Sequence, residues 1–267
     1  MTFSIVARDP ATGDLGIAIA SKALAVGAVA PFARAGVGAI STQALPNVAY
    51  GPDGLERLAA GEDPESVLAA LTAADSIASQ RQAGIVDALG RAASWTGSDC
   101  MPWAGGRTAP GVAIQGNILT GPEVVDAMLA TWESSTGSFP RRLVAALRAG
   151  DQAGGDSRGR QSAALLVRRE KGGVGGADDR WIDLRIDDHT DPVTELGRLL
   201  ALHEEQTNLL DPDKLAKIGS ALVSQAKIAI KGAMAPKGDG APAAGTLIAS
   251  PAELPAADAG ATPVGGG

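Results

Sequence analysis

The chain has 267 residues, of which 45% are hydrophobic, enough to bury one full core or one domain with an appendage. A formal net charge of −7 at pH 7 argues against nucleic acid or an anionic membrane surface as the main partner, because both attract clustered lysine and arginine. The single cysteine, Cys100, excludes an intrachain disulfide and a zinc site built from several thiolates, and we expect it to be a small buried hydrophobe.

The first half of the chain alternates strand patterns with two helical patterns. Alternating apolar residues on both sides of the turn formers at 9–14 predict a β-hairpin at the start of the chain. Asp63 and Pro64 are typical of an N-cap followed by the first helical position. The elements predicted here are strands at 3–8, 15–20, 37–42, 82–86, 91–96 and 111–115, and helices at 54–60 and 64–74.

The second half contains more helix, and its strongest strands come late. The predicted elements are helices at 122–132, 140–149 and 192–205, and strands at 161–169 and 180–186. Strands and helices therefore occur in groups rather than in strict alternation. This order predicts an α+β fold with two mostly antiparallel sheets packed together and helices outside.

The composition changes from about residue 207. Residues 211–231 are rich in lysine and alanine, so we expect an additional helix within 207–231. Residues 232–267 are mostly alanine, proline, glycine and threonine, and we expect them to be disordered because they contain too few large apolar residues to form a core. The predicted domain therefore covers residues 1–206.

Thr2 has the chemistry of a catalytic residue if the initiator methionine is removed. A small second residue normally permits that removal, and Thr2 would then carry both a hydroxyl and a free α-amine. The α-amine has a pKa near ~8, so an appreciable fraction is neutral at neutral pH and can accept the hydroxyl proton. The alternative is an ordinary threonine at the start of a strand, where threonine is favoured.

Five stretches of this sequence, in this order, resemble a bacterial family known as domain of unknown function 1028. They are TFSIVARDPATGDLGIAIASK, ARAGVGAISTQALPNVAYGPDGL, AIQGNILTGPEVVDAM, GGDSRGRQSAALLV and DDRWIDLRIDDHTDP. The resemblance covers residues 2–203. It implies membership of the N-terminal nucleophile hydrolase superfamily, which includes the proteasome β subunits, and a four-layer αββα sandwich with its site at the end of the first strand.

The resemblance also implies which residues form the catalytic centre. Proteasome-type sites combine an N-terminal threonine with an aspartate and a lysine further along the chain. Here Thr2 matches the nucleophile, Arg34 stands at the position of the lysine, and Lys22 is the alternative cation. Arg34 could supply a positive field but could not transfer a proton. Residues 18–21 contain no acidic residue at the position of the aspartate.

Several polar residues at strand ends are candidates for binding a substrate. Amide and hydroxyl groups at such places could hold an oxyanion or orient a substrate, and two arginines at 158–160 could bind a carboxylate. Polar turns and solvated loops would explain the same residues equally well. The substrate-binding candidates are Ser41, Gln43, Asn47, Gln115, Asn117, Arg160 and Gln161.

The combined prediction is an N-terminal nucleophile amidohydrolase that cleaves an unknown small amide, with Thr2 as the nucleophile and oxyanion donors near Gln43 and Asn117. The alternative is a non-catalytic binding or assembly module, of the kind labelled as a fimbrial-assembly protein. We expect a homo-oligomer that needs no cofactor. With two histidines in the chain, a histidine-based metal site is not expected, and residues 187–189 are the one alternative.

The sequence also indicates where the protein resides. It shows neither a basic-then-apolar leader nor a run of about 18 apolar residues, which are the signals for secretion and for membrane insertion. We therefore expect a cytoplasmic protein that does not bind membranes.

Overall fold

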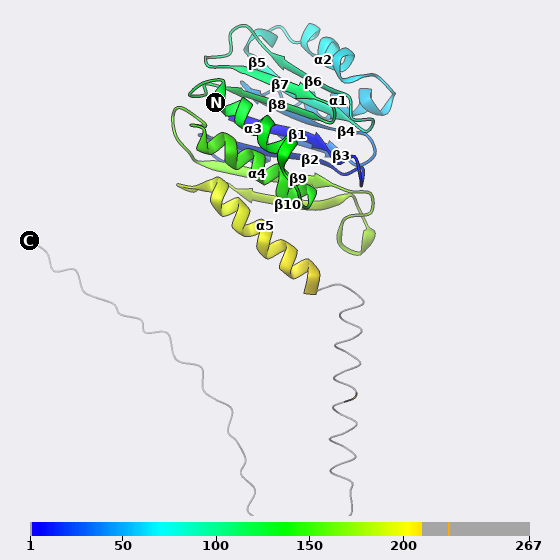
Figure 1. The fold of residues 1–267 in the computed structure, drawn as a ribbon. Coiled ribbons are helices and arrows are strands. Elements are labelled where there is room, and N and C mark those ends of the chain that lie inside the picture. Colours follow the sequence, from blue (N-terminus) through cyan, green and yellow to red (C-terminus); the bar gives the residue numbers. More distant parts are fainter. Residues whose placement is uncertain (1, 210–223, 225–267) are drawn as a thin grey trace, which may run out of the picture. The chain divides into compact units, whose positions relative to one another are not determined.

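The computed structural model describes residues 2–209 and residue 224 (Figure 1). The chain divides into two units, 1–211 and 212–267, and the following account concerns the first. The predicted helix at 211–231 and the predicted tail from 232 lie outside the described residues, apart from residue 224.

The described residues form two antiparallel sheets and five α-helices, which confirms the predicted α+β class. The six-stranded sheet has the order β10-β9-β2-β1-β8-β7, and the four-stranded sheet has the order β3-β4-β5-β6. The strands are β1 (Thr2–Arg8), β2 (Leu15–Ser21), β3 (Pro31–Arg34), β4 (Gly38–Ala44), β5 (Arg81–Asp87), β6 (Ala92–Thr96), β7 (Gly105–Ala109), β8 (Val112–Asn117), β9 (Ser162–Arg168) and β10 (Arg180–Ile186).

The helices join the strands in the predicted order. They are α1 (Tyr50–Ala59), α2 (Pro64–Ala73), α3 (Glu123–Ser134), α4 (Phe139–Gln152) and α5 (Pro192–Leu209), with short 3₁₀ turns η1 (Val26–Ala28), η2 (Ala78–Gln80) and η3 (Val174–Gly176). Asp63 caps α2 as predicted, because its side chain accepts the backbone N–H of Ser66 at 3.0 Å. Within the described residues, none of the helices combines the length and the apolar composition that crossing a membrane requires.

The sequence did not reveal two edge strands and one helix start. β3 has only four residues and begins with proline, and β7 begins with two glycines, so neither shows a period-2 apolar pattern. Both pair on one side only, which makes such short strands possible. Helix α1 starts at Tyr50 because Gly51 packs directly on the Phe32 ring, where a Cβ would lie only 2.2 Å from a ring carbon.

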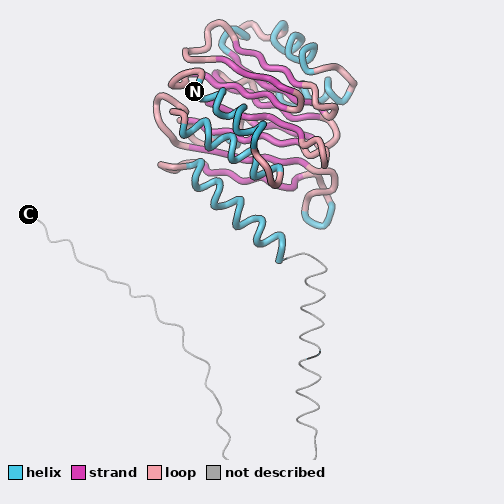
Figure 2. The backbone as a smooth tube through the Cα atoms, in the orientation of Figure 1, coloured by secondary structure: helices cyan, strands magenta, loops and turns pink. Residues whose placement is uncertain are grey.

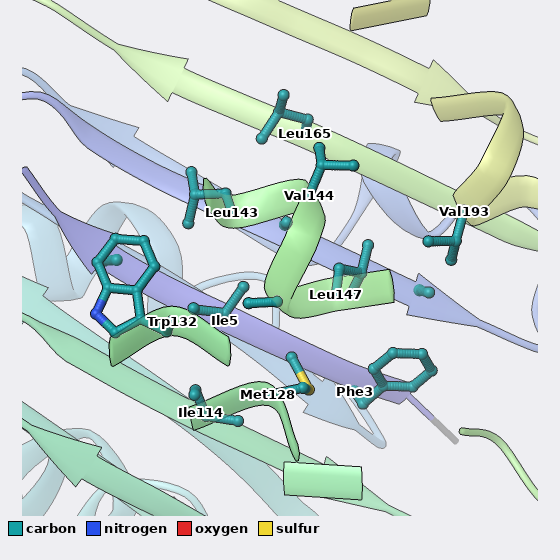
Figure 3. Close-up of a cluster of buried hydrophobic side chains, with 14 of the residues drawn as sticks. Phe3, Ile5, Ile114, Met128, Trp132, Leu143, Val144, Leu147, Leu165 and Val193 are labelled. Carbon is teal, nitrogen blue, oxygen red and sulfur yellow. The ribbon is translucent and has the colours of Figure 1, made fainter. Parts of the chain in front are cut away.

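Alternation along β1 divides its side chains between two environments. Phe3 and Ile5 pack with Met128, Leu143 and other apolar residues of α3 and α4 (Figure 3). Thr2, Ser4 and Val6 point to the other face of the sheet, where Ser4 and Val6 meet residues of β4 and β5. This alternation brings the Thr2 side chain into the space between the two sheets.

Three clusters of buried apolar side chains hold the fold together. One joins the six-stranded sheet to α3, α4 and α5, and another joins the four-stranded sheet to α1 and α2. The third contains residues of both sheets, including Ile17, Ile19 and Val86, and fills part of the space between them. Burying each such side chain stabilises the fold by roughly 2 kcal/mol. In Figure 2 the start of β1 lies among the loops at one end of the strands.

Candidate functional site

Thr2 starts β1 and is already buried, with 6% of its surface exposed. The register of the hairpin puts Thr2 opposite Ser21 on β2, and on the other side Thr2 pairs with Asn117 on β8. The hydroxyl oxygens of Thr2 and Ser21 are hydrogen-bonded at 3.1 Å. The predicted nucleophile therefore has a second hydroxyl as its nearest polar neighbour.

Two buried amides hold the main chain of Thr2. Gln43 Nε2 and Asn117 Nδ2 donate to the Thr2 carbonyl oxygen at 3.2 and 3.4 Å, and both also donate to Gln82 Oε1 at 2.8 and 2.9 Å. An amide nitrogen carries only two hydrogens, and Gln43 Nε2 also lies 3.3 Å from the Gln115 carbonyl, so the acceptors already present use the hydrogens of both amides. In this arrangement Gln43 and Asn117 orient Thr2, and the presence of oxyanion donors near them stays a prediction.

The same network continues away from Thr2. Ser4 Oγ donates to Gln43 Oε1 at 2.7 Å and lies 2.6 Å from Gln115 Nε2, while Ser41 Oγ donates to Gln43 Oε1 at 3.4 Å. Gly84 leaves room for the Gln115 amide, because a Cβ there would lie 2.0 Å from its Oε1. Among the described residues, that buried Oε1 has no hydrogen-bond partner. Ser41 and Gln115 thus support the residues that contact Thr2.

The loop before β9 is tied to the end of β2. The Lys22 backbone N–H donates to Asp156 Oδ2 at 2.8 Å, and the Lys22 ammonium donates to the Arg160 carbonyl at 3.3 Å. The Gln161 N–H donates to the Ser21 carbonyl at 3.1 Å. Since Ser21 contacts Thr2, the structure brings Lys22 and this loop to one side of the nucleophile.

The side chains of Arg160 and Gln161 are engaged at the surface. Arg160 forms an ion pair with Asp151 at 2.7 Å, which raises the pKa of the arginine. Gln161 Nε2 donates to Asp188 at 3.1 Å. Their main chains therefore lie beside the site, whereas their side chains bind acidic partners in this structure.

Two predicted site residues are not brought to Thr2. Arg34 pairs with Gly38 at the start of β4, whereas Gln43 lies near the other end of that strand, and the Arg34 side chain forms an exposed ion pair with Glu56 at 2.6 Å. The structure therefore places Arg34 away from Thr2. Asn47 turns away as well, since its side chain accepts the N–H of Ala49 at the start of α1.

A cluster around Asp75 fixes the loop between β4 and α1. Asp75 accepts hydrogen bonds from Asn47 and Tyr50 and forms an ion pair with Arg81 at 2.9 Å, and Arg81 also donates to the Leu45 carbonyl. Burial opposes ionisation of Asp75, but these donors outweigh it and hold its pKa well below the usual range. Burial, with the nearby Asp75 charge, raises the pKa of Tyr50 to about 12.

A cavity of about 330 Å³ lies next to residues that hold the main chain of Thr2, although Thr2 itself does not line it. Asn117, which bonds to Thr2, and Ala44, which follows Gln43, are both part of its wall. Ala44 and Ile118 adopt the left-handed region, with φ of 68° and 50°, which is costly for a side chain with a Cβ and most so for a β-branched one. Such strain concentrates at functional sites. The lining residues are Ala44, Leu45, Gln80, Asp99, Cys100, Met101, Asn117 and Ile118.

Residues 2–196, almost all of the described unit, match a family described as family of unknown function DUF1028. The chain belongs to the DUF1028 family. A crystal structure of protein SPO2555 from Silicibacter pomeroyi, assigned to the same family, is similar to this DUF1028 protein with a TM-score of 0.69 and 33% identity, covering 80% of this chain and 92% of that one. The chain has no match among curated proteins. The family expected from the sequence is confirmed.

Three residues of this DUF1028 site were not predicted from the sequence. Ser21 could have been found, because a hairpin closed by residues 9–14 pairs residue 8 with residue 15 and hence Thr2 with Ser21. Gln82 gave no local signal, since it lies in the apolar strand β5. Asp156 belongs to a polar stretch before β9 that the sequence did show, but its contact with the Lys22 amide, 134 residues away, could not be read from it. Only the tertiary fold assembles them.

A metal site was the alternative for residues 187–189 of this DUF1028 chain. His189 Nδ1 accepts the backbone N–H of Asp191 at 2.9 Å, and Asp188 accepts from Gln161. Across residues 2–209, the structure contains no group of three or more histidine, cysteine or acidic residues placed to hold a metal ion. The geometry of the described residues therefore does not support a metal site at 187–189.

Proposed function

We propose that this DUF1028 protein is an N-terminal nucleophile amidohydrolase that cleaves a small amide, with Thr2 as its nucleophile once Met1 has been removed. The observation that carries the proposal is the position of Thr2. Its hydroxyl is hydrogen-bonded to Ser21, its carbonyl is held by two buried amides, and one of those amides, Asn117, lines a cavity. A threonine that only begins a strand does not require these buried hydroxyl and amide contacts, which is why they support a functional role.

The arrangement of the core supports placing the chain in the N-terminal nucleophile hydrolase superfamily. Apolar clusters lie between α1/α2 and one sheet, between the two sheets, and between the other sheet and α3–α5. These clusters support our proposal of a four-layer αββα sandwich, the fold that the resemblance implies. In such a sandwich, the nucleophile at the start of β1 opens at one end of the space between the sheets.

The proposed reaction begins with proton transfer from Thr2. In the proposed relay, Ser21 Oγ, which is hydrogen-bonded to the Thr2 hydroxyl, takes the proton of that hydroxyl and passes its own proton to the Thr2 α-amine, so that the charge on Ser21 does not change. Thr2 Oγ1 then attacks the amide carbon, the C–N bond breaks, and the ammonium proton goes to the leaving amine. Water attacks the resulting ester, and the acyl group leaves as a carboxylic acid.

The neighbouring residues have supporting roles in this proposal. Gln43 and Asn117 fix the main chain of Thr2, which keeps the hydroxyl at one position relative to the cavity. Lys22, with an ammonium bound only to the Arg160 carbonyl among the described residues, contributes positive charge next to Ser21. Arg34 has no role in the proposal. The homo-oligomer expected from the sequence stays a prediction.

The first experiment is the intact mass of the purified protein. The proposal requires the mass of the chain without Met1, because a retained methionine would convert the Thr2 amine into an amide that cannot act as a base. A mass that includes Met1 on the whole population would end the catalytic proposal and favour the non-catalytic binding module.

The second experiment measures turnover on a panel of small amides, N-acyl amino acids and cyclic ureides. Thr2→Ala should abolish turnover while leaving the fold intact, and Thr2→Ser should retain part of the turnover, because serine keeps both the hydroxyl and the amine.

Ser21→Ala tests the relay and should lower kcat by roughly 10- to 100-fold. Lys22→Met should lower kcat/KM by only about 5-fold, since an exposed charge contributes up to ~1 kcal/mol. Hydrolysis by Thr2→Ala at the parental rate would refute the mechanism.

A further inference from the structure

We propose that the cavity lined by Asn117 binds one substituent of the substrate amide, and that Asp99 makes this pocket prefer a substituent that ends in an ammonium group. The inference rests on the proposed function, because it names the class of amide that the proposed amidohydrolase would take as a substrate. It can nevertheless be tested by binding alone.

The position of the cavity connects it to the nucleophile. Asn117 lies opposite Thr2 in the sheet and donates to the Thr2 carbonyl, and the same side chain lines the cavity. On the facing sheet, Gln43 donates to that carbonyl, and the next residue, Ala44, lines the cavity. A group bound in the cavity would therefore lie against Asn117, a residue that itself contacts the Thr2 main chain.

The wall of the cavity determines what it can bind. Leu45, Met101 and Ile118 provide apolar surface. Leu45 and Met101 are exposed to solvent, at 49% and 62% of their surface. Asp99 is the one charged residue among the lining residues. Within residues 2–209 it forms no ion pair, and its carboxylate accepts only the Ser98 hydroxyl at 3.3 Å. A short apolar chain with a cationic end matches this surface.

The size of the cavity limits the length of that chain. At about 330 Å³ it lies at the small end of the range of roughly 300–1,000 Å³ that ligand pockets occupy. It therefore suits a substituent of a few carbon atoms rather than a long acyl chain. The expected ligands are amides of small amino acids whose amino group is separated from the amide by a few methylenes.

Cys100 provides a direct reporter of occupancy. It is the only cysteine in the chain and lines this cavity, half-buried, with its thiol donating to the Arg81 carbonyl at 3.3 Å. Burial raises the pKa of the Cys100 thiol, and the Asp99 charge adds to the effect, so alkylation should be slow enough to follow by mass spectrometry. A ligand in the cavity should slow the reaction further.

The test measures protection of Cys100 from N-ethylmaleimide at about pH 8 by three amides of similar size. These are 4-aminobutanamide, which is cationic, butanamide, which is neutral, and succinamate, which is anionic. We expect saturable protection in the order cationic, neutral, anionic. Because Asp99 is exposed, each step should be about 3- to 5-fold in half-protecting concentration, as for an exposed charge pair.

Substitutions assign the preference to one carboxylate. Asp99→Asn should remove the difference between 4-aminobutanamide and succinamate, whereas Asp53→Asn, an equally exposed aspartate on α1, should keep it. In the unmodified protein, raising the salt concentration to about 0.5 M should shrink the difference as charge screening predicts, which tests the proposal without any variant.

The proposal is overturned if none of the amides protects Cys100, if succinamate protects as well as 4-aminobutanamide, or if Asp99→Asn leaves the difference unchanged. Thr2→Ala separates it from the proposed function. Thr2→Ala should keep the same order of protection, because binding does not require the nucleophile. If it keeps both the protection and the parental turnover of a substrate, the pocket stands and the nucleophile assignment fails.

Discussion

The two ends of the space between the sheets differ sharply in composition. At the end away from Thr2, Val6, Leu15, Ile17 and Val86 form a fully buried apolar cluster. At the Thr2 end, the same strands present a buried set of hydroxyls and amides. Its members are Thr2, Ser4, Ser21, Ser41, Gln43, Gln82, Gln115 and Asn117. One pair of sheets therefore contains an apolar half and a polar half.

The apolar half and the polar half contribute differently to the stability of the fold. Apolar burial stabilises in proportion to area and needs no particular partner. A buried amide contributes about 1 kcal/mol net only when its groups are paired, and it costs about 1–3 kcal/mol for each group left unpaired. The polar half therefore stabilises the fold less than apolar residues would, and each of its groups must be aligned with a partner. Departures from an apolar core of this kind are expected at functional sites.

The largest expected effect is a cavity in the apolar half. Ile17→Ala should lower the free energy of unfolding by roughly 4 kcal/mol, because Ile17 is fully buried and its neighbours cannot collapse into the space. Urea denaturation measures the loss, and Ile17→Val should cost only about 1 kcal/mol. Protection of Cys100 by amides should not change under native conditions. A cost below about 1 kcal/mol for Ile17→Ala would show that this half is not the stabilising one.

Breaking the centre of the polar half should cost somewhat less. Gln82 accepts hydrogen bonds from Gln43 and Asn117 and donates to the Gly116 carbonyl at 2.7 Å. Gln82→Leu therefore leaves two buried donors and one buried acceptor without their partner. We expect a loss of roughly 3 kcal/mol by urea denaturation. Gln80→Leu, an exposed glutamine two residues earlier, is the control and should be nearly neutral. Equal stability of the two variants would contradict the network.

The Asp75–Arg81 pair next to the polar half should make stability depend on pH. The folded pKa of Asp75 is depressed, so its contribution is present above the unfolded pKa of about 3.9 and is lost as the pH falls towards the lower folded pKa. Asp75→Asn should cost roughly 2 kcal/mol at pH 7, less than a fully buried pair, because both side chains keep slight exposure. The difference between variant and parent should shrink below about pH 4. A difference that is constant with pH would exclude a charge effect.

The smallest expected effect concerns one hydroxyl of the polar half. Ser4→Ala removes a donor to Gln43 and an acceptor for Gln115, and it should cost about 1 kcal/mol because the methyl occupies much of the space. Thermal unfolding at fixed pH should detect this shift. Ser98→Ala, at an exposed serine, is the matched control and should leave the unfolding temperature unchanged.

Local patterns account for most of the fold but for only part of the site. The hairpin, the two antiparallel sheets and the helix order follow from period-2 and period-3.6 apolar patterns, which report burial on one face. Thr2, Gln43 and Asn117 were placed at strand ends, and the structure brings these ends together. Arg34 was chosen from an offset along the sequence, whereas its strand is antiparallel to β4 and places Arg34 opposite Gly38, at the end of β4 away from Gln43. Gln82 could not be found, because its role depends on strands far apart in the sequence.

The central place of β1 sets an order of events during synthesis. Ser21, one neighbour of Thr2, is 19 residues further along the chain, whereas the other neighbour, Asn117, is 115 residues further. At roughly 5–20 residues per second, a ribosome needs on the order of ten seconds to make the longer stretch. Until Asn117 has been made, the edge of β1 that pairs with β8 has no partner, so in the proposed enzyme an aminopeptidase would have this interval in which to remove Met1. In the proposed enzyme, maturation would thus be completed before the nucleophile is buried.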